Sequence, residues 1–127
     1  MTRVSVEVPA ELVSRVRETV LLLYEATAES LHLALRAGAP DEAHMHRARL
    51  DDLDDLARRL TRSERATALD APRELLHDVL YGALIDAGER LAQASNACWR
   101  GELPLDRVQE TAEEVLELDA LLRELSP

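Results

Sequence analysis

Aromatic residues and lysine are almost or entirely missing from this chain of 127 residues. There is no phenylalanine, and aromatic side chains make up 2% of the sequence, so leucine, valine and alanine must form the core. That composition favours helices packed on helices over a β-sandwich. All 15 cationic side chains are arginines, and the net charge is −10. This balance argues against nucleic-acid binding, because such surfaces need clustered cations to displace phosphate counterions.

Other absences concern the compartment and the membrane. A single cysteine, Cys98, cannot form an internal disulfide, so the chain does not need an oxidising compartment. No apolar run approaches the roughly 20 residues of a membrane-spanning helix. No apolar secretory segment opens the chain. We therefore expect a cytoplasmic protein that binds neither membranes nor nucleic acid.

Four of the five prolines predict helix starts, because each lies two residues ahead of an acid: Pro9, Pro40, Pro72 and Pro104. Proline fits the first helical position, where the missing N–H has no partner in the helix. An acid two residues later faces the positive end of the helix dipole. Two glycines, Gly38 and Gly101, are natural helix ends. The pattern predicts helices over residues 9–37, 40–65, 72–100 and 104–125.

The two halves of the chain resemble each other when the second is shifted back so that Pro72 falls on Pro9. We call this shift the repeat offset. It also aligns Val16 with Val79, and a slightly larger shift, which aligns Asp41 with Asp106, extends the match through the later helices.

This internal similarity predicts the architecture, because two stacked hairpins form a minimal closed core. We therefore expect one all-α domain over residues 1–127, an antiparallel four-helix bundle made of two similar helical hairpins. The alternative is that amphipathic helices with similar ends look alike by chance.

A short N-terminal strand is predicted over residues 3–8, where Val4, Val6 and Val8 alternate with polar side chains. A lone strand leaves its backbone hydrogen bonds unsatisfied, so it must pair with something. We find no second convincing strand in this sequence. The expected partner is the same strand of a second subunit.

The third predicted helix carries two apolar stripes, one more than a single packing seam needs. The second stripe includes Tyr81, Ile85, Gly88, Ala92 and Trp99. Aromatic residues concentrate at the most stabilising positions of protein interfaces. The alternative is a central helix whose second stripe is covered by neighbours in the same bundle.

Two exposed leucines on the otherwise polar side of the first helix, Leu22 and Leu33, also favour an oligomer. The predicted function is a non-catalytic module for homodimerisation or protein interaction, with a regulatory or adaptor role and no cofactor. The predicted interface comprises the strand and stripe residues Val4, Val6, Val8, Tyr81, Ile85, Gly88, Ala92 and Trp99.

A metal-dependent bundle enzyme is the first alternative function. Carboxylate-bridged dimetal bundles use Glu-x-x-His motifs on facing helices, and the chain has this spacing at Glu29–His32 and at Glu74–His77. The two motifs do not occupy equivalent places in the two halves. Cys98 lies on the predicted inward seam, where a core thiol is the ordinary explanation. We therefore assign no catalytic, cofactor or metal residue.

The opening residues Arg3-Val-Ser-Val-Glu-Val-Pro-Ala-Glu-Leu12 resemble the start of a ribbon-helix-helix DNA-binding protein. The resemblance implies a dimeric ribbon that places Arg3, Ser5 and Glu7 in the major groove. It covers about the first dozen residues only. The first predicted helix is about twice too long for that family, and no short second helix with a capping serine follows. A DNA-binding regulator or antitoxin is thus the second alternative.

Overall fold

The computed structural model describes residues 2–61 and 65–125. In chain order the elements are strand β1 (Arg3–Val8), a 3₁₀ turn (Ala10–Leu12), helices α1 (Val13–Arg36) and α2 (Pro40–Thr61), strand β2 (Thr67–Pro72), and helices α3 (Arg73–Trp99) and α4 (Leu105–Glu124). The prediction of a mostly helical chain with four helices and an N-terminal strand is confirmed. The second helix ends at Thr61, earlier than expected, and the predicted extension to residue 65 passes through residues 62–64, which lie outside the described part.

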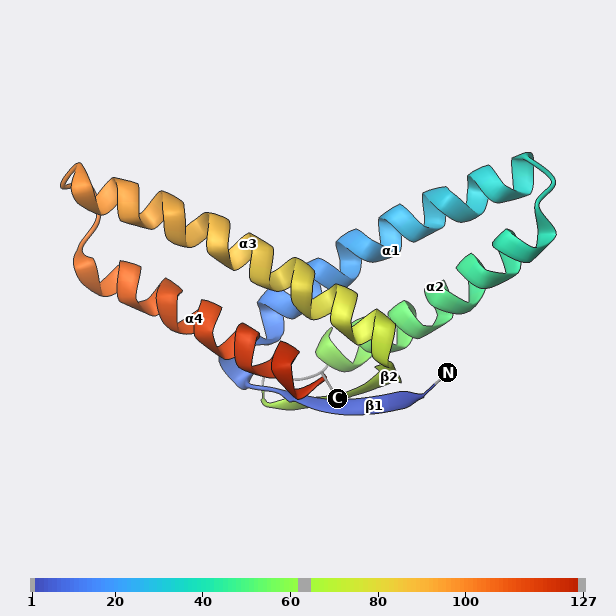
Figure 1. Ribbon diagram of the computed structural model, residues 1–127, viewed down its shortest axis with the longest axis horizontal. Coiled ribbons are helices and arrows are strands. Elements are labelled where there is room, and N and C mark those ends of the chain that lie inside the picture. Colours follow the sequence, from blue (N-terminus) through green and yellow to red (C-terminus); the bar gives the residue numbers. More distant parts are fainter. Residues whose placement is uncertain (1, 62–64, 126–127) are drawn as a thin grey trace.

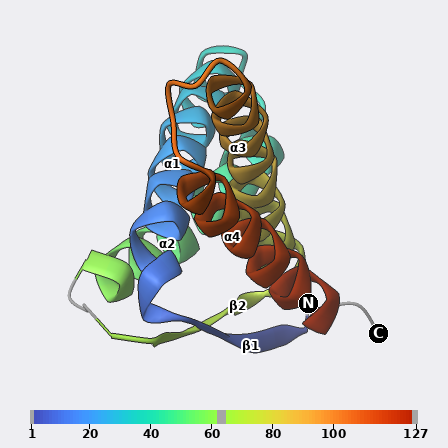
Figure 2. The same cartoon turned by 90° about the vertical axis from the view of Figure 1, so that its left-hand side faces the viewer.

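The helices lie as two pairs that diverge from a central crossing. Helix α1 runs beside α2, α3 runs beside α4, and α1 crosses α3, so the far ends form two arms (Figure 1). The two-stranded ribbon lies across the base of the crossing (Figure 2). The bundle is therefore closed at its centre, whereas each arm has only its own two helices to pack against.

A close contact between Thr19 and Gly82 allows α1 and α3 to cross. A Cβ atom added at Gly82 would lie 2.9 Å from Cγ2 of Thr19, nearer than side-chain atoms normally approach. Glycine at this position lets the two helices touch. The two contact residues are themselves related by the repeat offset.

The strands β1 and β2 pair with each other in antiparallel orientation inside one chain, with Val6 opposite Leu69. The prediction that the chain has no second strand is therefore wrong. The expected pairing of Val4, Val6 and Val8 with a second subunit is replaced by pairing with β2. Val6 and Val8 are also at most 3% exposed, so their side chains offer nothing further to a partner.

The core lies where the ribbon, the crossing and the inner ends of α2 and α4 meet. Its largest fully buried side chains are all leucine and valine, as the lack of phenylalanine predicts: Val8, Leu12, Val16, Val20, Leu53, Leu56, Leu60, Leu69, Leu76, Val79, Leu80 and Leu118. Burying each such side chain contributes about 1.5–3 kcal/mol. The core fixes the crossing and leaves the arms to depend on fewer apolar contacts.

Helices α1 and α3 end in the same way. Gly38 and Gly101 have φ of 67° and 74°, a left-handed conformation that favours glycine. Three backbone hydrogen bonds close the first end: Ala37 to Leu33, Gly38 to Leu35 and Ala39 to Ala34. The same three recur at the repeat offset: Arg100 to Asn96, Gly101 to Cys98 and Glu102 to Ala97.

Candidate interaction surface and groove

One apolar face of α3 remains uncovered in the structure. We call it the α3 flank and define it as Tyr81, Ile85, Gly88, Ala92 and Trp99, which follow one another at helical spacing. Tyr81 is 49% exposed, Ile85 47% and Trp99 89%. The alternative in which neighbours of the same bundle cover this stripe therefore does not hold for its three large side chains.

Local contacts position the two aromatic residues of the α3 flank. The rings of Tyr81 and His77, one turn apart, stack at 5.8 Å with an interplanar angle of 10°. Trp99 borders a shallow hollow of about 340 Å³ at the end of the arm, together with the half-buried Cys98 and with Leu105 of α4. The flank thus ends in an exposed indole beside an open hollow.

The equivalent face of α1 is chemically different. At the repeat offset, Leu22 corresponds to Ile85 and is 67% exposed. The counterparts of Tyr81, Gly88, Ala92 and Trp99 are all charged: Glu18, Glu25, Glu29 and Arg36. Leu33, at 57% exposed, lies further along the same arm. The two halves therefore share the same order of helices, but the apolar face is found on α3 and not on the equivalent face of α1.

A groove of about 610 Å³ lies between α1, α2 and the start of α3. Helix α1 lines it with Leu23, Ala26, Thr27 and Ser30, which share one face at 3–4 spacing. The remaining lining residues come from α2 and from the junction of β2 with α3: His44, Met45, His46, Ala48, Arg49, Asp52, Pro72, Glu74 and Leu75. No local sequence pattern indicates this groove, because three separated segments build it.

Two ion pairs surround the groove. The Nη2 group of Arg49 donates a hydrogen bond to Oδ2 of Asp78 at 2.8 Å. On α2, Asp52 accepts a hydrogen bond from Nη1 of Arg3 at 3.4 Å. Both acids therefore already have an arginine partner within the chain.

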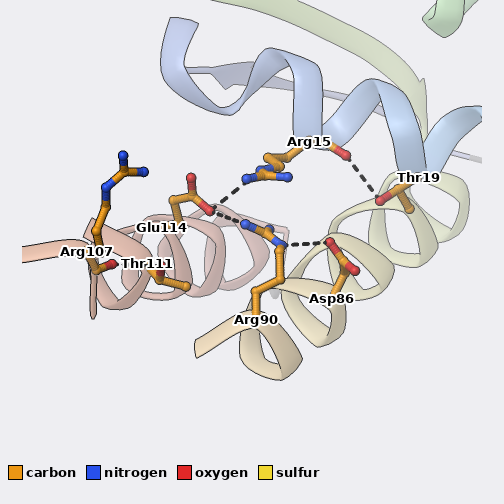
Figure 3. Close-up of polar contacts among 7 residues, drawn as sticks. All are labelled: Arg15, Thr19, Asp86, Arg90, Arg107, Thr111 and Glu114. Atoms are coloured by element: carbon orange, nitrogen blue, oxygen red, sulfur yellow. Dashed lines mark hydrogen bonds and ion pairs between the residues drawn. The ribbon is translucent and has the colours of Figure 1, made fainter. Parts of the chain in front are cut away.

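A polar network of charged side chains lies in the second half of the chain and reaches α1 (Figure 3). Arg90 donates from Nη1 to Oε2 of Glu114 at 2.8 Å and from Nε to Oδ2 of Asp86 at 3.1 Å. Arg15 approaches the same Glu114 oxygen at 3.8 Å. Burial disfavours the charged form of Arg90, but its hydrogen bonds to Glu114 and Asp86 outweigh that cost and raise its pKa. The network joins α1, α3 and α4 through charges.

Glu117 of α4 lies near Glu11 of the 3₁₀ turn. Burial of the Glu117 carboxyl raises its pKa above the ordinary value of 4.5, and the nearby carboxylate of Glu11 raises it further. One oxygen of Glu117, Oε2, is buried without a hydrogen-bond partner. The raised pKa means that the protonated form of this side chain is more favoured in the folded chain than in the unfolded chain.

The two Glu-x-x-His motifs do not build a metal cluster with other ligands in the structure. Within residues 2–61 and 65–125, no three His, Cys, Asp or Glu side chains come together as a set that could hold a metal ion. His32 is exposed on α1. His77 is exposed as well, and its ring stacks on that of Tyr81.

The outer face of the ribbon carries the side chains that a ribbon-helix-helix protein would direct at DNA. Arg3, Ser5 and Glu7 are exposed there, as the resemblance implies. The guanidinium of Arg3, however, donates to the backbone oxygen of Asp70 at 3.0 Å and lies 3.5 Å from the Asp70 carboxylate. The only cation of β1 is thus held by acids of its own chain.

None of the helices in the described residues has both the length and the apolar character needed to cross a membrane. Comparison of the chain with protein-family models, with curated proteins and with solved structures gives no match.

Proposed function

We propose that this chain is a non-catalytic module for homodimerisation or protein interaction, with a regulatory or adaptor role in the cytoplasm, and that the α3 flank is its contact surface. The observation that carries the proposal is the exposure of Tyr81, Ile85 and Trp99 along one helix face. Exposed apolar residues scattered singly need no explanation, but residues gathered on one face mark an interaction surface.

The chemistry of the α3 flank supports a self-association surface. Charged residues are depleted at the centres of interfaces, and the flank contains none. Tyrosine and tryptophan supply large contact areas at the centres of interfaces. Gly88 and Ala92 between them leave room for a second helix backbone to approach. In a chain with a net charge of −10, an uncharged face is also where two copies repel each other least.

We also infer that the fold consists of two similar helical hairpins, each preceded by a strand. Three observations support the inference. The ribbon register is symmetric about the pair Val6–Leu69, whose members are related by the repeat offset. The contact between Thr19 and Gly82 joins a second pair with this offset. The hydrogen bonds that end α1 recur at the end of α3 with the same offset.

The dimer is tested by sedimentation over a range of protein concentrations. We expect the wild-type chain to shift from monomer to dimer, and Ile85→Asp or Trp99→Arg to shift that equilibrium toward monomer by tenfold or more while the helical circular dichroism is retained. The matched control is Leu116→Asp on α4, where the leucine is 68% exposed but lies outside the flank. A wild-type mass that remains monomeric up to several hundred micromolar would exclude homodimerisation.

A further inference from the structure

We infer that the partner of the α3 flank is the α3 flank of a second copy of this chain, packed in antiparallel orientation so that Tyr81 of each copy lies against Trp99 of the other. This arrangement rests on the proposed function, and it adds which residues meet and in which direction the two helices run. It follows from the sizes of the side chains along the flank and from the polarity of the two edges beside it.

The residues of the α3 flank are separated alternately by four and three positions, a spacing typical of helices that pack along one another. Ser95, which is half-buried, completes this series. A twofold axis beside the middle of the series sets its first position against its last. The facing pairs are Tyr81 with Trp99, Ile85 with Ser95, and Gly88 with Ala92.

The side chains that face each other in this arrangement fit in size. Gly88 and Ala92 at the middle have little or no side chain, so the two backbones can approach closely. Next to them Ile85, which is 47% exposed, meets the small side chain of Ser95. Large residues opposite small ones allow facing layers to interdigitate. A parallel pair would instead set Ile85 against its own copy and hold the backbones apart beside the small residues.

The two edges of the flank differ in polarity, and this difference also favours the antiparallel orientation. One edge carries the half-buried residues Leu84, Leu91 and Cys98, seven positions apart. The other edge carries Glu89 and Asn96, which are exposed and have the same spacing. In an antiparallel pair each edge meets the same edge of the second copy, so apolar residues face apolar ones. In a parallel pair each edge meets the opposite one, and the leucines would face the polar residues.

The hollow at the end of the arm receives a side chain of the second copy in this arrangement. Its volume is about 340 Å³, and its lining residues are Ser95, Cys98, Trp99, Leu105 and Val108. Tyr81 of the second copy faces Trp99 and therefore lies over the hollow. The stacking contact with His77 already holds the ring of Tyr81 in place. One chain thus supplies the hollow and the other supplies the aromatic side chain that covers it.

The size and charge of the interface predict a reversible dimer. Tyr81, Ile85 and Trp99 of two copies, with Leu105 beside the hollow, expose on the order of 1,000 Å², which is about the least area that a specific interface needs. The twofold axis also brings Glu89 near its own copy. Both carboxylates are exposed, so solvent and salt screen their repulsion.

Mixing two variants with complementary charges tests the orientation. Tyr81→Glu and Trp99→Arg should each weaken the homodimer by at least about tenfold, because each damages the contacts at both ends of the interface. An equal mixture should associate at least about tenfold more tightly than either variant alone, since one end then pairs glutamate with arginine and the other keeps Tyr81 against Trp99. Both positions are exposed, so the variants should fold. Sedimentation measures the association.

The matched control is a mixture of Trp99→Arg with Ile85→Asp. These substitutions do not face each other in the antiparallel pair, so the mixed dimer still contains two damaged contacts. We expect this mixture to associate no more tightly than the better of its two components.

Cross-linking gives a second measurement that leaves both aromatic residues in place. In a Cys98→Ala background, Ile85→Cys mixed with Ser95→Cys should form mainly the mixed disulfide on oxidation. Antiparallel packing separates each of these positions from its own copy by about 15 Å along the helix axis, too far for a disulfide. Gln93→Cys, which is exposed on α3 outside the flank, replaces Ser95→Cys in the control and should give no mixed disulfide.

The outcomes distinguish this arrangement from the dimer itself. Disulfides between identical variants in place of the mixed one, or no disulfide in a sample that sediments as a dimer, would overturn the antiparallel pairing and leave the dimer. A mixture of Tyr81→Glu and Trp99→Arg that associates no more tightly than its components would overturn the pairing too. A wild-type chain that stays monomeric would exclude the dimer and the pairing together.

Discussion

At the scale of single residues, Gly82 determines how closely α1 and α3 cross. Because an added methyl group would lie 2.9 Å from Cγ2 of Thr19, Gly82→Ala should push the two helices apart where they cross. We expect a loss of about 1–3 kcal/mol in the free energy of unfolding, the usual cost of overpacking. Urea denaturation followed by circular dichroism measures it. Adding Thr19→Ser, which removes Cγ2, should restore most of the loss.

Gly88 is the control for this substitution, since it lies in the same helix and a Cβ there meets no atom within 4 Å. Gly88→Ala should raise the stability of the monomer by about 0.5–1 kcal/mol, because alanine restricts the unfolded chain and favours the helix. Equal losses for both alanine variants would mean that the contact with Thr19 does not limit the crossing.

The stability of the fold should depend on pH through Glu117. Its pKa is raised in the folded chain, first by burial and then by Glu11, so the protonated form stabilises the fold. That stabilisation is complete below the unfolded pKa and is lost as the pH rises through the folded pKa. Glu117→Gln, which resembles the protonated form, should therefore be more stable than the wild type at pH 7 by about 0.5 kcal/mol, a modest value because the side chain is only partly buried and solvent screens its charge.

The stability difference between Glu117→Gln and the wild type should shrink toward zero near pH 4. Urea midpoints at the two pH values measure it, and Glu110→Gln, an exposed glutamate of the same helix, serves as the control. A variant less stable than the wild type at pH 7 would show that the ionised carboxylate is the stabilising form.

At the scale of elements, proline and glycine positions predicted the helices well, and local propensity failed at β2. The segment Thr67–Pro72 alternates buried and exposed residues, but its exposed positions include Ala68 and Asp70, which are poor strand formers. Tertiary pairing with β1 overrides that preference. The repeat contained the missing signal: the predicted strand at 3–8 precedes Pro9, and the repeat offset places its counterpart at 66–71, directly before Pro72.

The pairing of β1 with β2 can be tested at this scale through Leu69. Leu69 is fully buried opposite Val6, so Leu69→Ala should cost about 2–4 kcal/mol in the free energy of unfolding. Leu35→Ala, at a leucine that is 63% exposed at the end of α1, should cost less than about 0.5 kcal/mol. Because the ribbon forms within one chain, the loss at Leu69 should not depend on protein concentration. A loss that falls as concentration rises would indicate strand pairing between subunits.

The candidate sites differ in how far the sequence could predict them. The α3 flank is local to one helix, so the spacing of Tyr81, Ile85 and Trp99 indicates it directly. The groove depends on the angle between α1, α2 and the start of α3, which no local pattern encodes. Its lining comes from three segments far apart in the sequence, so only their arrangement in space shows it.

At the scale of the whole molecule, the open arms should be the least stable part of the fold. The crossing packs four helices and the ribbon around one core, whereas each arm far from the crossing has only its own two helices (Figure 1). Local opening costs less free energy where fewer apolar contacts are buried. Amide hydrogen exchange at low protein concentration should therefore be at least tenfold slower at 12–20 and 75–83 than at 31–43 and 94–108.

Measuring amide exchange at a higher protein concentration then distinguishes the two arms. If a second copy covers the α3 flank, exchange should slow further over 84–99, where α3 carries the flank, and should not change over 24–36 of α1, whose equivalent face is charged. Trp99→Arg should abolish this concentration dependence without altering protection at the crossing. Equal slowing of both arms would instead require a dimer that buries α1 as well, because exchange reports only the surfaces that the second copy covers.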